Sequence, residues 1–215
     1  MSNATAADRI RERGVIAIMR ASSSDQLLAA ADAILAGGVN AIEVTMTTPG
    51  ALRVVEQAIA RYGQDVLFGA GSVLDPETAR AAILAGAQFV VGPTLNLRTI
   101  DVCKRYAVTV IPGAYTPTEI LTAWEAGADM VKVFPADVGG PAYLKAIKAP
   151  LPQISLVPVG GVDLDTAADF IRAGAAALGV GSALINQKLL DEGDFAELTR
   201  RAARFREEVA RGRGT

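Results

Sequence analysis

The sequence predicts one (β/α)8 barrel, also called a TIM barrel, with an extra helix at its N-terminus. Eight short runs of apolar and β-branched residues recur along the chain, and segments with helical periodicity separate them. Most of the runs are continuously hydrophobic, as in parallel strands that are covered on both faces. Because the units are even in length and no linker interrupts them, a barrel is favoured over a doubly wound sheet. We expect residues 1–215 to form this single domain.

The eight predicted strands share the same make-up, a short apolar run followed by glycine, proline or a polar residue. They are residues 14–20, 41–46, 67–72, 89–94, 108–114, 130–136, 154–161 and 176–184. The segment 4–12 is predicted as the extra N-terminal helix and 193–211 as the final helix. A short helical stretch, 183–189, is expected just before that final helix.

Several helix ends carry recognisable signals. Asp75 followed by Pro76 is an N-cap with proline in the first turn, and Thr116 with Glu119 has the spacing of a capping box. Four helices are expected to stop at a glycine in the left-handed conformation. These glycines are Gly37, Gly86, Gly127 and Gly174.

Composition excludes several kinds of site. The chain has no histidine, which rules out a Ser-His-Asp triad, a histidine-ligated zinc ion and an imidazole base. Its one cysteine, Cys103, excludes an internal disulfide and is predicted to be a buried apolar residue of a helix. A net charge of −2 favours neither nucleic acid nor an anionic membrane as partner. With no apolar run of about 18 residues and no signal-peptide core, we expect a soluble, cytoplasmic protein.

Polar residues at the ends of the predicted strands mark the expected active site, because barrels of this kind place their sites at the C-terminal ends of the strands. On the first six strands these residues are Arg20, Glu43, Thr45, Thr47, Ser72, Thr94 and Lys132. The last two strands end in a glycine-rich set, Gly160, Gly161, Gly179, Gly181 and Ser182.

Lys132 is the least expected of these residues, because the stretch "DMVKVFPAD" otherwise reads as a buried strand. An ammonium group is costly there unless it is paired or neutral. One interpretation is a structural ion pair with Glu43 inside the barrel. The other is an amine whose pKa is lowered by desolvation, so that it is available as a nucleophile.

The glycine-rich ends of the last two strands also allow two interpretations. In many barrels the loops after these strands, together with a short extra helix, bind a phosphate group through backbone N–H groups. The segments "VGGVD" and "GVGSALINQ" fit that pattern. The alternative is that these glycines only permit tight turns and close packing.

Five segments together resemble the KDPG/KHG aldolase family. They are "AGGVNAIEVTMTTP", "GAGSVLDPETARAAILAGAQFVVGPTLN", "VIPGAYTPTEI", "KVFPAD" and "VPVGGV", and they follow one another in the family's order between Gly14 and Ala183. The resemblance implies a metal-free class I aldolase that needs no cofactor. Such an enzyme cleaves 2-keto-3-deoxy-6-phosphogluconate (KDPG) to pyruvate and glyceraldehyde 3-phosphate through a lysine Schiff base. It also implies a homotrimer.

The resemblance assigns roles to individual residues. The Schiff-base lysine of the K-x-F-P motif falls on Lys132, and the general acid/base glutamate of the E-V-T motif falls on Glu43. The remaining positions bind substrate in the family: the pocket positions fall on Ser72, Pro93 (through its carbonyl) and Phe134, and the phosphate-binding positions on Gly160, Gly161, Gly181 and Ser182.

One position departs from the pattern of some relatives, which carry an arginine four residues after the glutamate to hold the substrate carboxylate. Here that position is Thr47, which stays among the expected substrate-binding residues. Other relatives carry an arginine at the end of the first strand, as Arg20 does here. We therefore expect Arg20 to bind the carboxylate, with Ser72 assisting.

Alternative functions remain open. The galactonate-derived epimer of the substrate or 4-hydroxy-2-oxoglutarate fits the same chemistry. A phosphosugar isomerase or epimerase shares the predicted fold, although metal-dependent epimerases of that kind need histidine ligands. A barrel that binds sugar phosphates without catalysis is the third class, and it does not explain Lys132.

Overall fold

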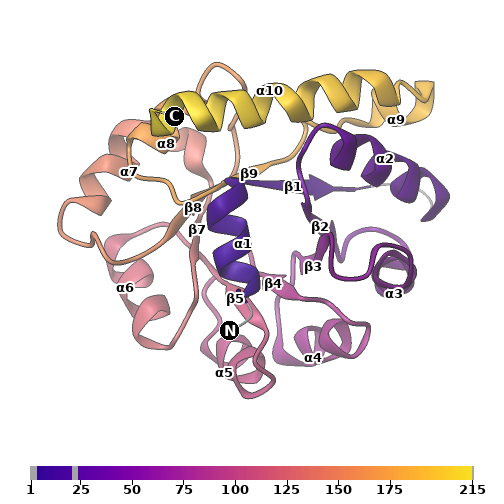
Figure 1. The fold of residues 1–215 in the computed structure, drawn as a ribbon. Helices are drawn as coiled ribbons and strands as arrows, with labels where there is room; N and C mark the ends of the chain where they lie inside the picture. Colours follow the sequence, from indigo (N-terminus) through magenta and orange to yellow (C-terminus); the bar gives the residue numbers. More distant parts are fainter. Residues whose placement is uncertain (1–3, 21–23, 215) are drawn as a thin grey trace.

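Parallel strands surrounded by helices make up the computed structural model of the chain, which describes residues 4–20 and 24–214 (Figure 1). The strands are β1 (Val15–Met19), β2 (Ala41–Thr45), β3 (Leu67–Gly71), β4 (Phe89–Val91), β5 (Thr109–Ile111), β6 (Gly113–Ala114), β7 (Val131–Val133), β8 (Leu156–Pro158) and β9 (Leu178–Val180). Six of them pair in the order β5-β4-β3-β2-β1-β9 and the other three in the order β6-β7-β8. All the pairings are parallel.

The two sheets close into one barrel at two places. β5 and β6 are halves of one strand that is interrupted at Pro112, which has no N–H to donate to a ladder. The backbone N–H of Lys132 on β7 still donates to the Pro112 carbonyl (2.9 Å). On the other side, a parallel bridge between Val159 and Gly179 joins β8 to β9. The predicted (β/α)8 barrel is therefore confirmed.

Helices surround the barrel, except α1, which lies across its centre (Figure 1). They are α1 (Ala6–Arg13), α2 (Ser24–Ala36), α3 (Ala51–Tyr62), α4 (Pro76–Leu84), α5 (Leu97–Arg105), α6 (Pro117–Glu125), α7 (Gly140–Lys148), α8 (Ala167–Arg172), α9 (Gln187–Glu192) and α10 (Phe195–Arg213), with a 3-10 turn η1 (Ala136–Val138) after β7. The extra N-terminal helix and the long final helix are confirmed.

The short helix before α10 begins later than predicted. Residues 182–184 form a turn, and α9 starts only at Gln187. The side chain of Asn186 sets this start, because it accepts a hydrogen bond from the N–H of Leu189 (3.0 Å) and caps the helix. The predicted stretch 183–189 was therefore wrong in its first four residues.

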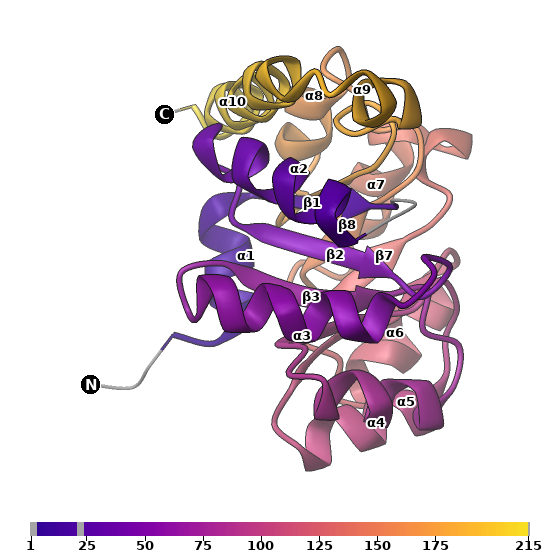
Figure 2. The same cartoon turned by 90° about the vertical axis from the view of Figure 1, so that its right-hand side faces the viewer.

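Alternate residues of the strands divide the apolar core into two layers. One set points outward and packs beneath the helices, while the other fills the inside of the barrel. Ala7 and Ile10 of α1 belong to the inner set, so α1 plugs one end of the barrel. Figure 1 shows α1 across the centre of the ring, and Figure 2 shows it at the end where the strands begin. The opposite end, where the strands finish, is left for a site.

The predicted caps of α4 and α6 are confirmed. The Asp75 side chain accepts a hydrogen bond from the N–H of Thr78 (2.6 Å), and Thr116 and Glu119 form a complete capping box. Three of the four predicted glycine stops also have the left-handed conformation: φ is 92° at Gly86, 94° at Gly127 and 100° at Gly174.

The prediction for Gly37 was wrong, because the left-handed residue is its neighbour Gly38, with φ of 87°. Gly37 serves packing instead. A Cβ atom there would lie 2.5 Å from the Cβ of Ala202 on α10, so the missing side chain lets α2 and α10 approach closely.

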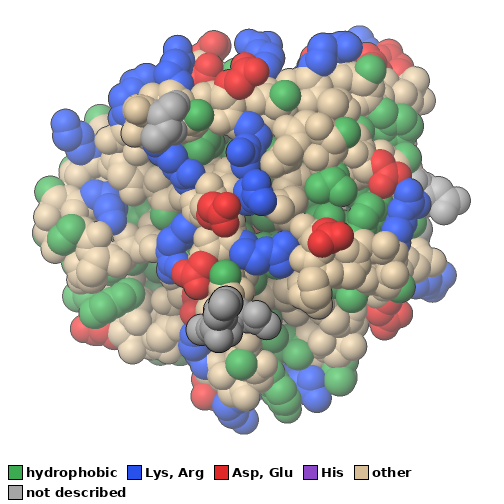
Figure 3. Space-filling view, viewed as in Figure 1, with side chains coloured by type: hydrophobic (Ala, Val, Ile, Leu, Met, Phe, Trp, Pro, Cys, Tyr) green, Lys and Arg blue, Asp and Glu red, His purple; other side chains and the backbone are tan. Residues whose placement is uncertain are grey.

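The surface around α1 carries both signs of charge. Figure 3 shows basic and acidic side chains interspersed on this face. Within α1, Arg11 forms an ion pair with Asp8 (2.9 Å). On α10, Arg201 pairs with Glu197 (2.8 Å), as expected for a solvated helix face.

Cys103 is buried, as predicted. Within residues 4–20 and 24–214, no helix combines the length and apolar character needed to span a bilayer.

Candidate active site

Three charged residues face the interior of the barrel near its open end. They are Arg20 after β1, Glu43 on β2 and Lys132 on β7. The alternation of a strand sets their direction, since residues two apart share a face. Two positions before each of them lies a side chain of the barrel interior: Ile18, Ala41 and Met130. The three charges therefore lie on the inner face, one layer above the apolar filling.

Lys132 is buried, with only 6% of its surface exposed. Burial lowers the pKa of its amine, the Glu43 carboxylate opposes that shift, and Arg20 adds to it. The Nζ atom lies 4.9 Å from the centre of the Phe134 ring, an arrangement that favours a cation over the ring face. Desolvation has the largest effect on this pKa, so less free energy is needed to deprotonate the Lys132 amine here than in water.

Glu43 is buried even more completely, at 2% exposure. Burial raises the pKa of its carboxyl group, and the nearby Lys132 and Arg20 lower it in part. Among residues 4–20 and 26–214, whose side chains the structure describes, none forms a hydrogen bond with the Glu43 carboxylate or an ion pair with it within 4.0 Å. Glu43 and Lys132 therefore interact through space, without the direct structural ion pair that one interpretation of the sequence required.

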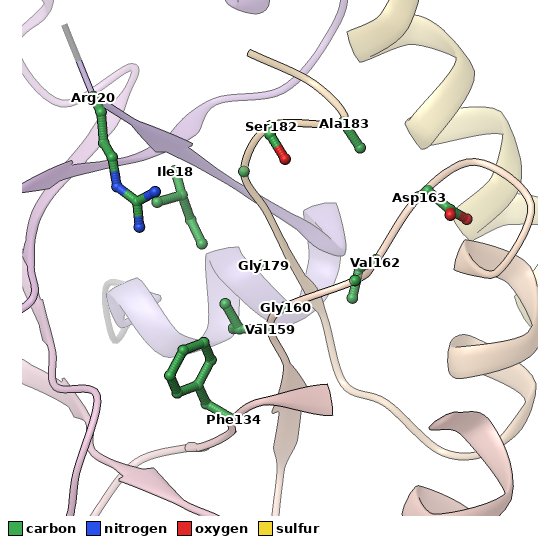
Figure 4. Close-up of a pocket in the computed structure, with 12 residues that line it drawn as sticks. Ile18, Arg20, Phe134, Val159, Gly160, Val162, Asp163, Gly179, Ser182 and Ala183 are labelled. Carbon is green, nitrogen blue, oxygen red and sulfur yellow. The ribbon is translucent and has the colours of Figure 1, made fainter. Parts of the chain in front are cut away.

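A cavity of about 570 Å³ opens beside these charges, as Figure 4 shows. Arg20 enters it from one side, the ring of Phe134 lies across from it, and the chain that carries Ser182 forms a third wall. Its full lining is Ile18, Arg20, Phe134, Val159, Gly160, Gly161, Val162, Asp163, Gly179, Gly181, Ser182 and Ala183. The cavity thus brings together Arg20, Phe134 and all four positions predicted to bind phosphate.

Backbone geometry separates these glycines into two groups. Gly160 and Gly161 have φ of 92° and 69°, and a Cβ on Gly161 would overlap the Asp137 side chain. A tight turn and close packing therefore explain both. Gly181 does not have a left-handed φ, and a Cβ there would have no atom within 4 Å. Neither the turn nor the packing of the described residues requires glycine at position 181.

Ser72, Pro93 and Thr47 lie outside the cavity lining. Ser72 follows β3 directly and has φ of 58°, a strained value for a residue other than glycine. The Pro93 carbonyl lies against Gly113, where any Cβ would overlap it. Gly113 is the register partner of Lys132 on the neighbouring strand. The Pro93 carbonyl, which lies against Gly113, is therefore close to the lysine.

Thr47 is exposed, and its hydroxyl lies 2.9 Å from that of Thr45. Thr45 in turn lies 3.4 Å from the hydroxyl of Thr48, and both Thr45 and Thr48 are buried. Thr45 and Thr47 were both predicted among the polar residues at the end of the second strand, whereas Thr48 was not. Thr45 lies two residues after Glu43 on the same strand and therefore faces the same way.

The sequence also missed the apolar and acidic parts of the cavity wall. Ile18 and Val159 line it as the last apolar residues of the barrel interior. Asp163 contributes too, although its carboxylate accepts hydrogen bonds from the N–H groups of Asp165 (3.0 Å) and Thr166 (2.9 Å). Across the described part of the chain, no three His, Cys, Asp or Glu side chains cluster in a way that could hold a metal ion.

Comparison with known proteins places this site in a family. The family model described as "KDPG and KHG aldolase" matches residues 6–201 of the chain. The chain belongs to the KDPG/KHG aldolase family. The predicted resemblance is thereby confirmed, and the family's members are lyases.

Named relatives in this aldolase family are similar over most of their length. The 2-dehydro-3-deoxy-6-phosphogalactonate aldolase of Escherichia coli is 40% identical over 171 residues, 79% of this chain and 83% of the relative. The 2-dehydro-3-deoxy-phosphogluconate aldolase of Treponema pallidum is 36% identical over 195 residues, 90% of this chain and 91% of the relative.

A solved aldolase structure is similar in fold as well. The KDPG aldolase of Legionella pneumophila superposes with a TM-score of 0.86 at 26% identity, covering 92% of this chain and 96% of that one. That structure holds pyruvate captured at low pH as a covalent carbinolamine intermediate.

Proposed function

We propose that this aldolase reversibly cleaves KDPG to pyruvate and glyceraldehyde 3-phosphate through a Schiff base on Lys132. The observation that carries the proposal is the amine of Lys132, which is buried on the inner face of the barrel while no carboxylate of the described residues pairs with it directly. A buried cation without a direct counter-ion is costly for a purely structural residue. The carbinolamine in the Legionella relative supports the same covalent chemistry.

The reaction begins when the neutral amine of Lys132 attacks the C2 ketone and forms a carbinolamine. Loss of water gives an iminium ion, which can accept electrons from the neighbouring carbon. Glu43, directly or through one water, removes the C4 hydroxyl proton, and the electrons of the C3–C4 bond move into the iminium. The aldehyde leaves and an enamine remains on Lys132. The Glu43 carboxyl group, which now carries the proton from the C4 hydroxyl, protonates the enamine at C3. Hydrolysis of the resulting iminium ion by water then releases pyruvate and regenerates the amine.

Glu43 fits the proton-transfer role because it is the one carboxyl group among the three charged residues of this layer, and the amine of Lys132 is engaged in the imine. Its pKa is raised by burial, toward the range in which a carboxyl group both accepts and donates a proton. Arg20 assists indirectly, since its charge helps to lower the pKa of Lys132. The chemistry therefore needs no histidine.

The cavity suggests how the two ends of the substrate are held. In this proposal the Arg20 guanidinium binds the planar carboxylate through parallel hydrogen bonds, assisted by Ser72. The Pro93 carbonyl, the Phe134 ring and Thr47 contact the pyruvyl part. The phosphate group lies against the backbone N–H groups that follow β8 and β9, at Gly160, Gly161, Gly181 and Ser182. The open space at Gly181 supports this, because the approach of a ligand explains a glycine that packing does not.

The galactonate-derived epimer is the second substrate candidate. It is favoured by the 40% identity with the E. coli phosphogalactonate aldolase, which exceeds the 36% identity with the T. pallidum phosphogluconate enzyme. A lactate dehydrogenase assay for released pyruvate, run with each epimer in turn, decides between them. A ratio of kcat/KM values that favours the phosphogluconate epimer supports the first assignment, and the reverse ratio supports the second.

Several further properties complete the proposal, some from the composition and pattern of the sequence and some, the trimer and the metal-free mechanism, from the family resemblance. We infer a single-domain, cytoplasmic homotrimer that uses no metal and no cofactor, and that has neither nucleic acid nor membrane as partner. Turnover that is unchanged after dialysis against a chelator would support the metal-free mechanism.

The decisive experiment is borohydride reduction in the presence of pyruvate, followed by peptide mass mapping. A reduced pyruvyl adduct on Lys132 is expected. Lys148 is the internal control: burial lowers its pKa too, but its amine donates to the carbonyls of Pro152 (2.7 Å) and Ile154 (2.9 Å). Lys132→Ala should abolish both adduct and turnover, whereas Lys145→Ala, on an exposed position of α7, should retain them. An adduct spread over several lysines, or none on folded protein, would overturn the assignment.

A further inference from the structure

We propose that Gly71 is a positioning residue for Glu43, because its missing side chain leaves the space that the glutamate carboxylate occupies. The inference rests on the proposed aldolase function and extends it to a residue that touches neither substrate nor the reacting lysine.

Gly71 is the last residue of β3 and lies on the strand next to Glu43. In the sheet register Glu43 pairs with Gly69 and Thr45 pairs with Gly71. Leu67, four residues before Gly71, belongs to the barrel interior, so Gly71 also faces inward. A Cβ on Gly71 would overlap the Oε1 and Cδ atoms of Glu43 and would lie 2.5 Å from its Cγ. The glutamate side chain thus lies directly over the Cα of Gly71.

The backbone does not explain glycine at this position. Gly71 is absent from the residues with left-handed φ, so its strand conformation is open to any L-residue. All three atoms nearest to the hypothetical Cβ belong to Glu43. Alanine at position 71 would therefore displace the Glu43 carboxylate. Gly69 differs, because the atoms nearest to a Cβ there belong to the Phe89 ring.

Contact with Gly71 matters because little else holds the carboxylate in place. Residues 4–20 and 26–214, the ones with described side chains, provide the Glu43 carboxylate with no hydrogen-bond donor and no ion pair within 4.0 Å. The orientation of its side chain is therefore limited by the shape of the barrel wall. Displacement by a methyl group would move the carboxylate by about 1 Å, a shift that costs about 100-fold when a reacting group is misplaced.

The expected defect is specific to proton transfer. In Gly71→Ala the amine of Lys132 should still form an imine with pyruvate, because the overlap involves only Glu43. Exchange of the pyruvate methyl protons with deuterated water, which needs the base, should fall by about 10- to 100-fold. The KM for pyruvate should change little. A merely structural role for Gly71 would lower trapping and exchange together.

A double-mutant cycle tests the steric argument. Glu43→Asp shortens the side chain by one methylene and withdraws the carboxylate from the methyl group of Gly71→Ala. If the two residues act through this contact, Glu43→Asp should cost much less exchange activity in the Gly71→Ala background than in the wild type. Losses that multiply independently would overturn the proposal. Gly69→Ala is the matched control: it should disturb packing at Phe89 and lower the Tm, while exchange per folded site is retained.

The outcomes separate this proposal from the proposed function. Wild-type protein that traps no pyruvate contradicts the aldolase mechanism itself. Wild-type protein that traps and exchanges pyruvate, together with Gly71→Ala that exchanges equally fast, overturns the role of Gly71 alone. Should Gly71→Ala fail to fold, Gly71→Ala with Glu43→Ala should restore a Tm close to that of Glu43→Ala, since the overlapping atoms are gone. A double variant that also fails to fold would overturn the steric argument.

Discussion

Replacing Lys132 with methionine should make the protein inactive but more stable. The amine is 6% exposed, and burial lowers its pKa below the ordinary value of 10.5. Near neutral pH, Lys132 therefore lowers the free energy of unfolding, because the folded protein must either bury an ammonium group or release its proton to water. Methionine has a similar length and no charge. Replacing buried ionic groups with apolar ones of similar volume commonly stabilises a protein, here by about 1–3 kcal/mol. For a chain of this size that corresponds to a rise in Tm of roughly 2–12 °C.

The pH dependence of this gain has a definite sign. Because the pKa of Lys132 is lower in the folded state than in the unfolded state, the unfolded state binds the proton more strongly. The wild type consequently gains stability as pH rises toward 10.5, and the advantage of Lys132→Met shrinks over the same range. Thermal melts of both proteins, near neutral pH and at a pH closer to that value, measure the difference directly.

Glu43 provides the internal check. Its carboxylate favours the ammonium form of Lys132, so its removal should leave the lysine more costly. Lys132→Met should therefore stabilise the Glu43→Gln variant more than it stabilises the wild type. A Tm that falls in Lys132→Met, or a gain that grows with pH, would refute the idea that Lys132 is kept at the expense of stability.

Four further substitutions test the proposed base, two residues with strained φ and one helix cap. In the wild type, the rate of pyruvate proton exchange should fall at acid pH as Glu43 becomes protonated, with a midpoint above pH 4.5 because burial raises the pKa of Glu43. Glu43→Gln should abolish this fall at acid pH, and a fall that persists in the variant contradicts the role of Glu43 as the base. Ala107→Gly, at φ of 54°, should raise the unfolding free energy by about 1 kcal/mol without changing activity, whereas Ser72→Gly should give a similar gain and a higher KM for pyruvate. Equal KM values for the two variants would remove Ser72 from the site. Asp75→Ala should lower the unfolding free energy by about 1 kcal/mol with kcat unchanged, and an unaltered denaturation midpoint would contradict the capping role.

Local signals in the sequence were sufficient for much of the fold. Apolar runs of strand length, helical periodicity and the caps at Asp75 and Thr116 act within a few residues, so each can be recognised without knowing the rest of the chain. The same locality made Lys132 stand out, because a charge in the middle of an apolar strand conflicts with its neighbours. The strand pattern was also enough to predict that Lys132 and Glu43 both face the interior of the barrel.

Choices between neighbouring residues depended on packing across the molecule. Gly37 and Gly38 are equally able to adopt a left-handed φ, and the approach of α10 to Gly37 decided that Gly38 would do so. The turn at 182–184 replaced the predicted helical stretch because the cap formed later, at Asn186. In both cases the local signals fit two neighbouring positions, and contacts with distant residues or with the cap selected one of them.

The sequence by itself determined which residues are chemically unusual: a lysine within an apolar strand, a glutamate two residues before a threonine-rich turn, and glycines after the last two strands. Only the tertiary structure decided what surrounds them. Pairing of β2 with β3 brings Glu43 over Gly71, and the arrangement of the chain after β9 leaves the space at Gly181 open, although no pattern within either segment records these distances. The physical reason is that burial, overlap and through-space charge depend on atoms far apart in the chain, which meet only when the strands pair.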